Sequence, residues 1–158
     1  MQNQPKTTDP DWTIKKILQW TTSYFGSNRI DSPRSTAEIL LSHALGLKRI
    51  DLYLRYDQPL VKSELDSFRS LIKRRIKREP VAYIVGSKEF WNIEVSVTKD
   101  VLIPRPETEC LVEEALNVLS AESLQSQKRV LELGTGSGAI ILSIASERPE
   151  HHYFASDI

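Results

Sequence analysis

Apolar residues recur at helical spacing through most of the first 80 positions of the chain. The spacing predicts a first helix over residues 11–25, which the small and polar residues 26–28 bring to an end. A second helix is predicted to begin at Pro33, with Ser32 as its N-cap, and to end at Gly46 in the left-handed conformation. The expected apolar faces are Trp12, Ile17, Trp20, Tyr24 and Phe25 in the first helix, and Ala37, Leu40, Leu41, Ala44 and Leu45 in the second.

Two further helices are predicted before residue 80. A short one covers residues 49–54, and a longer one begins near Ser63 and runs to Arg78, where Pro80 stops it. The buried stripe of the longer helix is Leu65, Phe68, Ile72 and Ile76. Together the four helices predict a helical bundle over residues 1–80, which is a viable size for a domain.

The pattern changes from helical to alternating after residue 81. Apolar and polar residues nearly alternate through residues 88–97, and Trp91-Asn92 can provide a turn in the middle. This predicts a β-hairpin over residues 86–98. We expect the segment 81–100, with this hairpin, to link the helical bundle to a second domain.

A helix, a strand, a helix and a second strand are predicted beyond residue 100. Pro106 opens the first of these helices, whose expected buried face is Leu111, Val112, Ala115, Leu116 and Leu119. The apolar run 130–133 predicts a strand, 139–148 a helix and 153–156 a second strand. Strands that alternate with helices indicate a parallel sheet, so the expected fold class is α/β, with the α/β domain beginning at residue 101.

Composition narrows the class of protein. The chain has 158 residues and 40% hydrophobic content, as folded globular domains do. No apolar run approaches the roughly 20 residues of a membrane span, and the N-terminus has no apolar segment typical of a secretory signal. We therefore expect a cytoplasmic protein without membrane contact. The single cysteine, Cys110, excludes an intramolecular disulfide, and no histidine has a metal-ligand partner at a suitable spacing.

Charge is distributed unevenly along a chain whose net charge is zero. Residues 1–80 carry 15 Lys and Arg against 9 Asp and Glu, whereas residues 81–158 carry 6 against 12. Such asymmetry suggests two units with different partners. The helix segment 69–78 is especially basic. It is either a patch near RNA or the ribosome, or simply a solvated helix face, and the absence of interleaved aromatic residues in its sequence favours the second interpretation.

A glycine-rich loop carries the clearest chemical signal. Glu132 is followed by glycines at 134, 136 and 138, between the predicted strand 130–133 and the helix that follows. Glycine permits left-handed backbone and close approach of a ligand, and the helix start offers unpaired N–H groups. Asp157 lies 19 positions after Gly138, at the end of the second strand, where a carboxylate can accept hydrogen bonds from ribose hydroxyls.

Several interpretations of this loop stay open from the residues alone. The spacing of Glu132 and the three glycines is typical of class I methyltransferases that use S-adenosyl-L-methionine. Read through Ala139 it also fits the dinucleotide fingerprint, which would indicate an NAD-dependent oxidoreductase. A phosphate-binding P-loop is disfavoured because no Lys-Ser/Thr pair closes the motif. The structural alternative is a tight turn, with Asp157 capping a strand end.

A stiff Pro-Arg-Pro segment precedes the α/β domain. Arg105 lies between Pro104 and Pro106, which restrict the backbone. The segment is either a structural hinge or one wall of the active site, in which case Arg105 would order the cofactor or substrate loop.

Three motifs lie in order along the chain and together resemble one known family. They are EPVAYIVG at residues 79–86 with EFW at 89–91, VLIPRPETE at 101–109, and LELGTGSGAI at 131–140. In this order they resemble the peptide chain release factor glutamine methyltransferases, the PrmC/HemK type. The resemblance covers essentially the whole chain, and its most specific part is the proline-rich motif.

The resemblance implies a fold, a reaction and a set of binding residues. The implied fold is a helical domain, a β-hairpin linker and a class I, Rossmann-like methyltransferase domain. The implied reaction transfers the methyl group of S-adenosyl-L-methionine to the side-chain amide of the glutamine in the Gly-Gly-Gln motif of release factors. The implied cofactor-binding residues are Glu132 near the amino group, Gly134, Thr135, Gly136, Ser137 and Gly138 along the methionine and ribose, and Asp157 at the ribose hydroxyls.

One family motif is absent from these 158 residues. The family activates the amide with an Asn-Pro-Pro-Tyr motif after its fourth strand, and no Asn-Pro-Pro occurs in this chain. The predicted parallel sheet also has only two strands. We therefore expect the chain to be the N-terminal portion of a longer protein, truncated after the second strand, with no catalytic residue of its own and no activity alone. The rival expectation is a helical module that only binds a partner.

Overall fold

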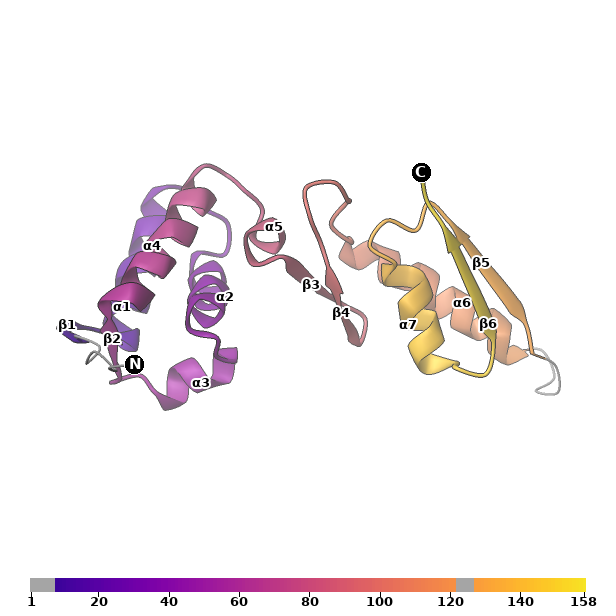
Figure 1. Ribbon diagram of the computed structural model, residues 1–158, viewed down its shortest axis with the longest axis horizontal. Coiled ribbons are helices and arrows are strands. Elements are labelled where there is room, and N and C mark those ends of the chain that lie inside the picture. Colours follow the sequence, from indigo (N-terminus) through magenta and orange to yellow (C-terminus); the bar gives the residue numbers. More distant parts are fainter. Residues whose placement is uncertain (1–7, 122–126) are drawn as a thin grey trace, which may run out of the picture. The chain divides into compact units, whose positions relative to one another are not determined.

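The computed structural model describes residues 8–121 and 127–158 and divides the chain into two compact units (Figure 1). The first unit spans Met1–Val85 and the second Gly86–Ile158. Helices dominate the first, and both units contain short sheets of two strands each. The division between the units falls inside the segment 81–100 that we expected to be a linker.

The first unit is a small helical bundle closed by one short strand pair. Its elements are β1 (Thr8–Thr13), α1 (Ile14–Ser27), α2 (Pro33–Leu45), α3 (Arg49–Leu54), β2 (Pro59–Val61), α4 (Lys62–Ile76) and α5 (Val81–Val85). Helix α2 packs against both α1 and α4, and β1 pairs antiparallel with β2 (Figure 1). The fully buried centre includes Phe25, Leu40, Leu41, Leu52 and Phe68. Burying a side chain of this kind stabilises the fold by about 1.5–3 kcal/mol.

Most predicted helix boundaries in this unit are confirmed. Helix α2 begins at Pro33 after Ser32 and ends at Gly46, which has φ 64°, and α3 covers residues 49–54 as expected. Helix α4 begins one residue before Ser63, at Lys62. Its first turn is capped by Glu64, whose Oε2 accepts a hydrogen bond from the Val61 amide at 2.8 Å.

Two expectations about the ends of helices are wrong, and one helix was not expected. The first helix begins at Ile14, because residues 8–13 form β1 and pair with β2 about fifty positions away. Helix α4 ends at Ile76, two residues before the predicted end at Arg78, and Arg78 adopts a left-handed φ of 69°. The short helix α5 was not expected.

The apolar face expected for the first helix is also partly wrong. Ile17 and Phe25 are buried, but Trp20 is 47% exposed and Tyr24 is 37% exposed. The buried stripe is Ile14, Ile17, Leu18, Thr21 and Phe25. At about 100° per residue, Trp20 and Tyr24 lie on the neighbouring stripe of the helix rather than on its core face.

The second unit combines a hairpin, a helix and a strand–helix–strand segment. Its elements are β3 (Ser87–Phe90), β4 (Ile93–Ser96), the 3-10 turn η1 (Pro106–Thr108), α6 (Glu109–Ala121), β5 (Arg129–Leu133), α7 (Ala139–Glu147) and β6 (His152–Ser156). The hairpin is confirmed, with Phe90 opposite Ile93 across the Trp91-Asn92 turn. Pro106 opens the 3-10 turn, and α6 follows at Glu109.

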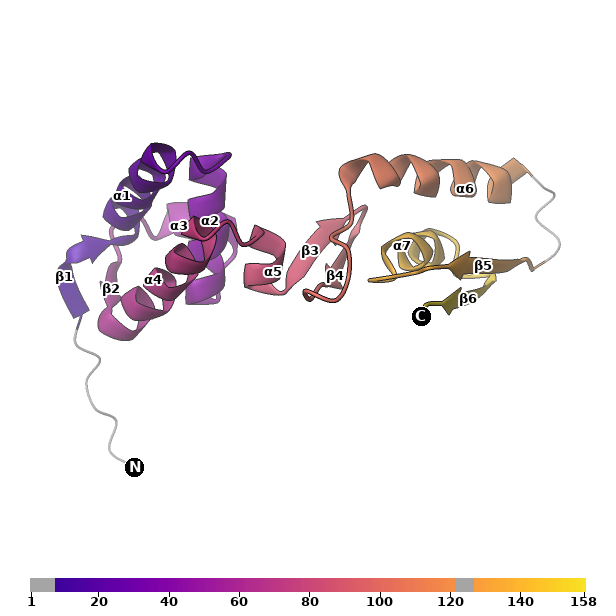
Figure 2. The same cartoon turned by 90° about the horizontal axis from the view of Figure 1, so that it is seen from above.

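Strands β5 and β6 run parallel and are joined by α7. Arg129 pairs with His152 and Leu133 with Ser156, so both strands end at the same edge. Helix α7 packs against both strands, against α6 and against β4 (Figure 2). Leu131, Leu133 and Phe154 on the strands stay 62%, 75% and 46% exposed. On α6 the expected buried face is only partly confirmed, because Val112 is buried but Leu111 is exposed.

Candidate functional site

The glycine loop, residues 134–138, connects the carboxyl end of β5 to the start of α7. The Gly134 and Thr135 amides both donate to the Ser156 carbonyl, at 2.8 and 3.1 Å, which ties the loop to the end of β6. Figure 1 shows the C-terminal end of the chain beside this end of β5. The loop therefore lies at the carboxyl edge of a parallel strand pair, where α/β folds bind their ligands.

Left-handed backbone explains why the loop needs glycine. Gly136 has φ 53° and Gly138 has φ 75°, conformations that disfavour a residue with a Cβ atom. Gly138 is also the N-cap of α7, and a Cβ there would lie 3.2 Å from Leu142 Cδ1. The loop can fold in this way because these positions carry no side chain.

Glu132 is held by the loop and by the helix that follows it. Its Oε2 accepts hydrogen bonds from Thr135 Oγ1 at 2.7 Å and from the Ile141 amide at 3.2 Å. Ile141 lies in the first turn of α7, so the carboxylate sits at the helix N-terminus, where the helix dipole favours a negative charge. The side chain is half-buried and fixed in orientation.

Asp157 is held from the other side of the loop. Its Oδ2 accepts a short hydrogen bond from the Gly136 amide, and its Oδ1 accepts one from the Ile158 amide at 2.8 Å. The hydrogen bond from Gly136, followed by that from Ile158, lowers the pKa of the Asp157 carboxyl. The carboxylate is exposed and ionised at neutral pH, so it acts only as an acceptor.

The structure brings most, but not all, of the expected site residues together. Glu132, the loop 134–138 and Asp157 meet at one edge and are joined by hydrogen bonds. Ser137 is half-buried within the loop. Arg105 is exposed at the start of η1, and within the described residues its side chain makes no hydrogen bond to the loop. Its role in the cofactor site thus stays a prediction.

The hairpin turn makes contacts that the sequence did not reveal. The Trp91 amide donates to Glu109 Oε1 at 3.1 Å, and its indole Nε1 donates to Glu147 Oε1 at 3.0 Å. Asn92 Nδ2 reaches the same Glu147 oxygen at 2.7 Å. These bonds tie the turn to α6 and to the end of α7. The charged and aromatic residues gave no signal of this pairing because 55 positions separate Asn92 from Glu147.

The basic segment 69–78 is less available than its sequence suggests. Arg74 forms two hydrogen bonds with the Glu79 carboxylate, at 2.8 and 2.7 Å, and Arg75 donates to the Glu79 carbonyl at 3.0 Å. Arg78 donates to the carbonyls of Arg29 and Asn28 at 2.7 and 3.0 Å. Three of the arginines therefore hold the first unit together.

The part of the chain that the structure describes contains neither a cluster of metal ligands nor a helix that could span a membrane. Among residues 8–121 and 127–158, no group of three or more His, Cys, Asp or Glu side chains is arranged to hold a metal ion. No helix in those ranges has the length and apolar character needed to cross a membrane.

The sequence matches one family model and many curated relatives. Residues 16–86 match the model of the PrmC N-terminal domain. Proteins named release factor glutamine methyltransferase are similar over most of the chain. The one from Rhodopirellula baltica is 44% identical over 95% of this chain and 51% of its own length. Those from Chlorobaculum tepidum and Geobacter sulfurreducens are 40% and 44% identical, over 93% and 87% of this chain and 51% and 47% of their own lengths.

These matches confirm the resemblance found in the sequence motifs. The family model covers the helical unit, and the relatives extend the similarity through the glycine loop, since the one from Rhodopirellula baltica matches 95% of the chain. The chain spans about half the length of the curated relatives it matches.

Proposed function

The chain belongs to the release factor glutamine methyltransferase family, and on that premise we propose that it carries the first part of the binding site for S-adenosyl-L-methionine. The full-length protein would transfer the methyl group to the side-chain amide of the glutamine in the Gly-Gly-Gln motif of peptide chain release factors. Residues 101–158 would form the beginning of its class I, Rossmann-like domain. The parallel β5–α7–β6 unit supports this assignment.

The position of Glu132 is the observation that carries the proposal. In a dinucleotide site the pyrophosphate binds at the helix N-terminus that follows the glycine loop. Here the Glu132 carboxylate already accepts the Ile141 amide of that turn, at 3.2 Å. A second anion would be repelled there, whereas the positively charged amino group of S-adenosyl-L-methionine would be attracted. This argues against the NAD-dependent oxidoreductase.

Asp157 fits the ribose of the same cofactor. A carboxylate offers about four lone-pair positions, and the Gly136 and Ile158 amides use two of them. Like any Asp carboxylate the group is a pure acceptor at neutral pH, and the bonds from Gly136 and Ile158 that lower its pKa favour this charged form, which suits two hydroxyl donors. The backbone bond from Gly136 also fixes the carboxylate against the loop that would line the methionine and ribose.

The remaining chemistry is assigned to residues beyond these. Bound S-adenosyl-L-methionine would supply an electrophilic methyl group, but an amide nitrogen is a poor nucleophile and must be aligned with it. The family's Asn-Pro-Pro-Tyr motif performs this role, and no Asn-Pro-Pro occurs in this sequence. The proposal therefore gives this chain cofactor binding and not amide activation, and expects no methyl transfer by the chain alone.

We infer that the two units have different roles. We assign residues 1–80 to recognition of the release factor, 81–100 to a linker with the hairpin, and 101–158 to the cofactor. The opposite net charges of the two halves, +6 over residues 1–80 and −6 over 81–158, support different partners for each. A pull-down of a release factor with the 158-residue chain tests the recognition role. If the chain does not retain the release factor at micromolar concentrations, the recognition role is contradicted.

Calorimetric titration of the full-length protein with S-adenosylhomocysteine and with NAD separates the two cofactor classes. We expect binding heat with S-adenosylhomocysteine and none with NAD. Heat with NAD alone would end the methyltransferase proposal. Mass spectrometry of a release factor incubated with the protein and S-adenosyl-L-methionine then locates the added methyl group, which we expect on the Gly-Gly-Gln glutamine.

A variant of Asp157 tests the site residue by residue. In the full-length protein we expect Asp157→Ala to raise the dissociation constant for S-adenosylhomocysteine on the order of 10- to 100-fold, because two ribose hydroxyls lose their acceptor. Asp100→Ala is the matched control, since Asp100 is also exposed and lies outside the loop. Equal dissociation constants for the two variants would contradict the ribose role.

A further inference from the structure

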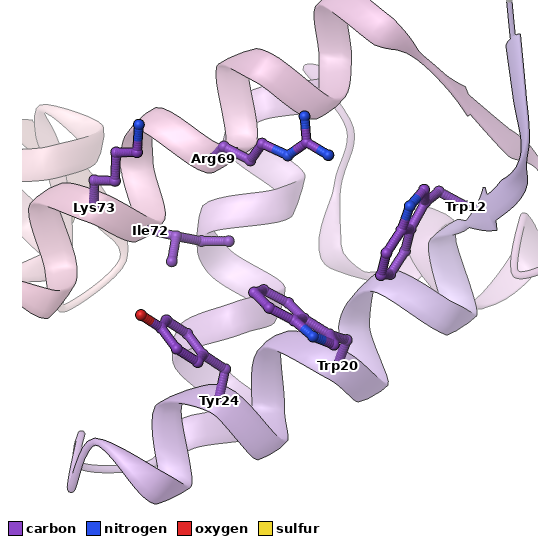
Figure 3. A pocket seen from close by; sticks show the side chains of 6 residues that line it. All are labelled: Trp12, Trp20, Tyr24, Arg69, Ile72 and Lys73. Atoms are coloured by element: carbon purple, nitrogen blue, oxygen red, sulfur yellow. The ribbon is translucent and has the colours of Figure 1, made fainter.

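An open pocket lies between α1 and α4 in the first unit, far in sequence from the glycine loop. Its volume is about 280 Å³, and Figure 3 shows its lining. Three aromatic side chains line one side and two cationic side chains of α4 the other. The lining residues are Trp12, Trp20, Tyr24, Arg69, Ile72 and Lys73.

The aromatic side is already arranged in mutually supporting pairs. The rings of Trp20 and Tyr24 stack with centroids 5.0 Å apart and planes 12° apart. Trp12 meets Trp20 edge to face, at 6.2 Å and 81°. Such pairs hold the rings in fixed orientations, and yet Trp20 remains 47% exposed. The pocket therefore presents rigid aromatic surface to the solvent instead of burying it in the core.

The cationic side consists of Arg69 and Lys73, two basic residues of α4 that do not hold the first unit together. Arg74, Arg75 and Arg78 are occupied by internal hydrogen bonds. The Lys73 ammonium makes no hydrogen bond or ion pair within residues 8–121 and 127–158. Arg69 pairs only with Asp66, at 3.2 Å, and both side chains are 55% exposed. Such an exposed pair contributes little, about 0–1 kcal/mol, and yields readily to a stronger anion.

A ligand that matches both sides must be planar, aromatic and anionic. A nucleobase with its phosphate has these properties, because the base stacks on aromatic rings while the phosphate meets Arg and Lys. The volume lies just below the range for small-molecule pockets, about 300–1,000 Å³, so the pocket suits one base better than a whole cofactor. In Figure 3 Ile72 lies between the cationic and aromatic side chains, as the apolar floor of such a site.

We propose that this pocket binds single-stranded RNA, one base stacking on the Trp20–Tyr24 pair and the adjoining phosphates meeting Arg69 and Lys73. Single strands are favoured over duplexes because only unpaired bases offer a free face to aromatic side chains. RNA is favoured over an acidic protein segment because the aromatic surface matches the π face of a base, which Asp and Glu do not have. The net charge of +6 on residues 1–80 adds a long-range attraction for a polyanion.

Fluorescence anisotropy of a labelled ten-nucleotide adenine oligoribonucleotide, titrated with the 158-residue chain, tests the proposal. We expect Trp20→Ala to weaken binding about 5- to 150-fold, the effect of losing one stacked base, and Trp20→Phe to restore part of the loss. Trp20 lies outside the core, so the variant should fold, and circular dichroism checks this.

The charged side is tested by salt dependence. Two phosphate contacts on a single strand contribute about 1.4 to the slope of log K against log salt. The double variant Arg69→Gln with Lys73→Gln should lower the slope by that amount. The matched control is Arg29→Gln with Arg55→Gln, which removes the same charge from two exposed residues outside the pocket. It should lower the slope by less.

Three outcomes would overturn the proposal. One is an equal loss of affinity for the oligonucleotide in the Arg69→Gln, Lys73→Gln variant and in the Arg29→Gln, Arg55→Gln control, which would mean that charge attracts RNA without a specific site. Another is AMP competing as well as the oligonucleotide at equal base concentration, which would mean a mononucleotide site. The third is no RNA binding by the native chain together with loss of release factor retention in Trp20→Ala, which would make the pocket a protein contact. The cofactor titrations with S-adenosylhomocysteine report on the other unit, so neither proposal depends on the other.

Discussion

Glu38 on α2 is a buried carboxylate whose removal should destabilise the first unit. Its side chain is 3% exposed. Its Oε1 accepts hydrogen bonds from Arg34 Nε, at 2.8 Å, and from the Tyr53 hydroxyl, and its Oε2 accepts one from Arg49 Nη2 at 2.7 Å. The group thus joins α2 to α3. A charge this deeply buried is tolerated only because its hydrogen bonds are satisfied.

The size of the effect follows from the burial of each partner. Removing one member of a fully buried pair costs about 3–5 kcal/mol, because the other charge is left unpaired. Here Arg34 and Arg49 are 54% and 53% exposed and can turn to water. We therefore expect Glu38→Gln to lower the free energy of unfolding by about 2 kcal/mol, a value reduced for this exposure. Asp66→Asn, which breaks an exposed pair, should lower it by at most about 0.5 kcal/mol.

The pH dependence gives a second, independent test of Glu38. Burial by itself raises the pKa of this carboxyl, but hydrogen bonds from Arg49, Tyr53 and Arg34 outweigh it and lower the pKa below its usual value. A carboxyl with a lowered pKa in the folded state contributes stability above its unfolded pKa of about 4.3. That contribution is lost as the pH falls through the lower, folded pKa. Wild type should therefore lose stability over this acidic window faster than Glu38→Gln.

Urea unfolding followed by tryptophan fluorescence measures both effects. Trp12 and Trp20 lie in the same unit as Glu38, so a Trp91→Phe background makes the signal report on that unit alone. The reasoning is refuted if Glu38→Gln lowers the free energy of unfolding by no more than Asp66→Asn does at pH 7. It is also refuted if the two acid profiles, wild type and Glu38→Gln, run parallel below pH 4.

Two further predictions concern the second unit. Gly138→Ala should weaken hydrogen-exchange protection of α7 by about 1–2 kcal/mol, because alanine is strained at φ 75°. The control is Gly26→Ala, where φ is not left-handed and no loss of protection is expected in the helix that contains it. Equal losses of protection in the two variants would exclude strain as the cause. Glu147→Ala should remove the acceptor of the Trp91 indole, shift tryptophan emission to the red and lower the free energy of unfolding by about 0.5–1.5 kcal/mol. The emission is measured in a background with Trp12 and Trp20 replaced by Phe. An unchanged spectrum there would show that the contact does not form in solution.

Local signals in the sequence predicted the elements whose limits are set locally. Helix α2 begins at Pro33 and ends at Gly46 because proline and glycine act on the backbone at their own positions. The hairpin β3–β4 follows from alternation in adjacent segments. Strands β1 and β2 were missed because they pair with each other from across about fifty residues.

Periodicity also failed where two neighbouring stripes of one helix are both apolar. In α1 the sequence offers Ile14 and Leu18 on one stripe and Trp20 and Tyr24 on the next. Helical spacing does not rank these two stripes. The structure buries the aliphatic one, and α1 packs against α2. The sequence of α1 alone does not contain this choice, because it depends on the neighbouring elements.

The glycine loop shows the same limit within a site. The sequence predicted Asp157 at ribose hydroxyls, and the family resemblance implied Glu132 near the amino group of the cofactor; the structure places both carboxylates at the loop. It also gives each a second partner that the motif does not specify, the Ile141 amide for Glu132 and the Gly136 amide for Asp157. Those bonds depend on how the loop turns back on itself. The proposed preference for a positively charged cofactor group rests on the bond from Ile141 to Glu132, which the spacing of the glycines alone does not predict.

The basic helix shows why charge counted along a sequence overstates an electrostatic surface. Six Lys and Arg residues lie within 69–78, but three arginines bind carbonyls and a carboxylate of their own unit. Their acceptors include Asn28 and Arg29, about fifty positions away. Arg69 and Lys73 remain beside aromatic rings contributed by another helix, a juxtaposition that no inspection of the helix itself would find. Three of the six cations therefore serve the fold, and two of the other three, Arg69 and Lys73, lie beside an aromatic surface.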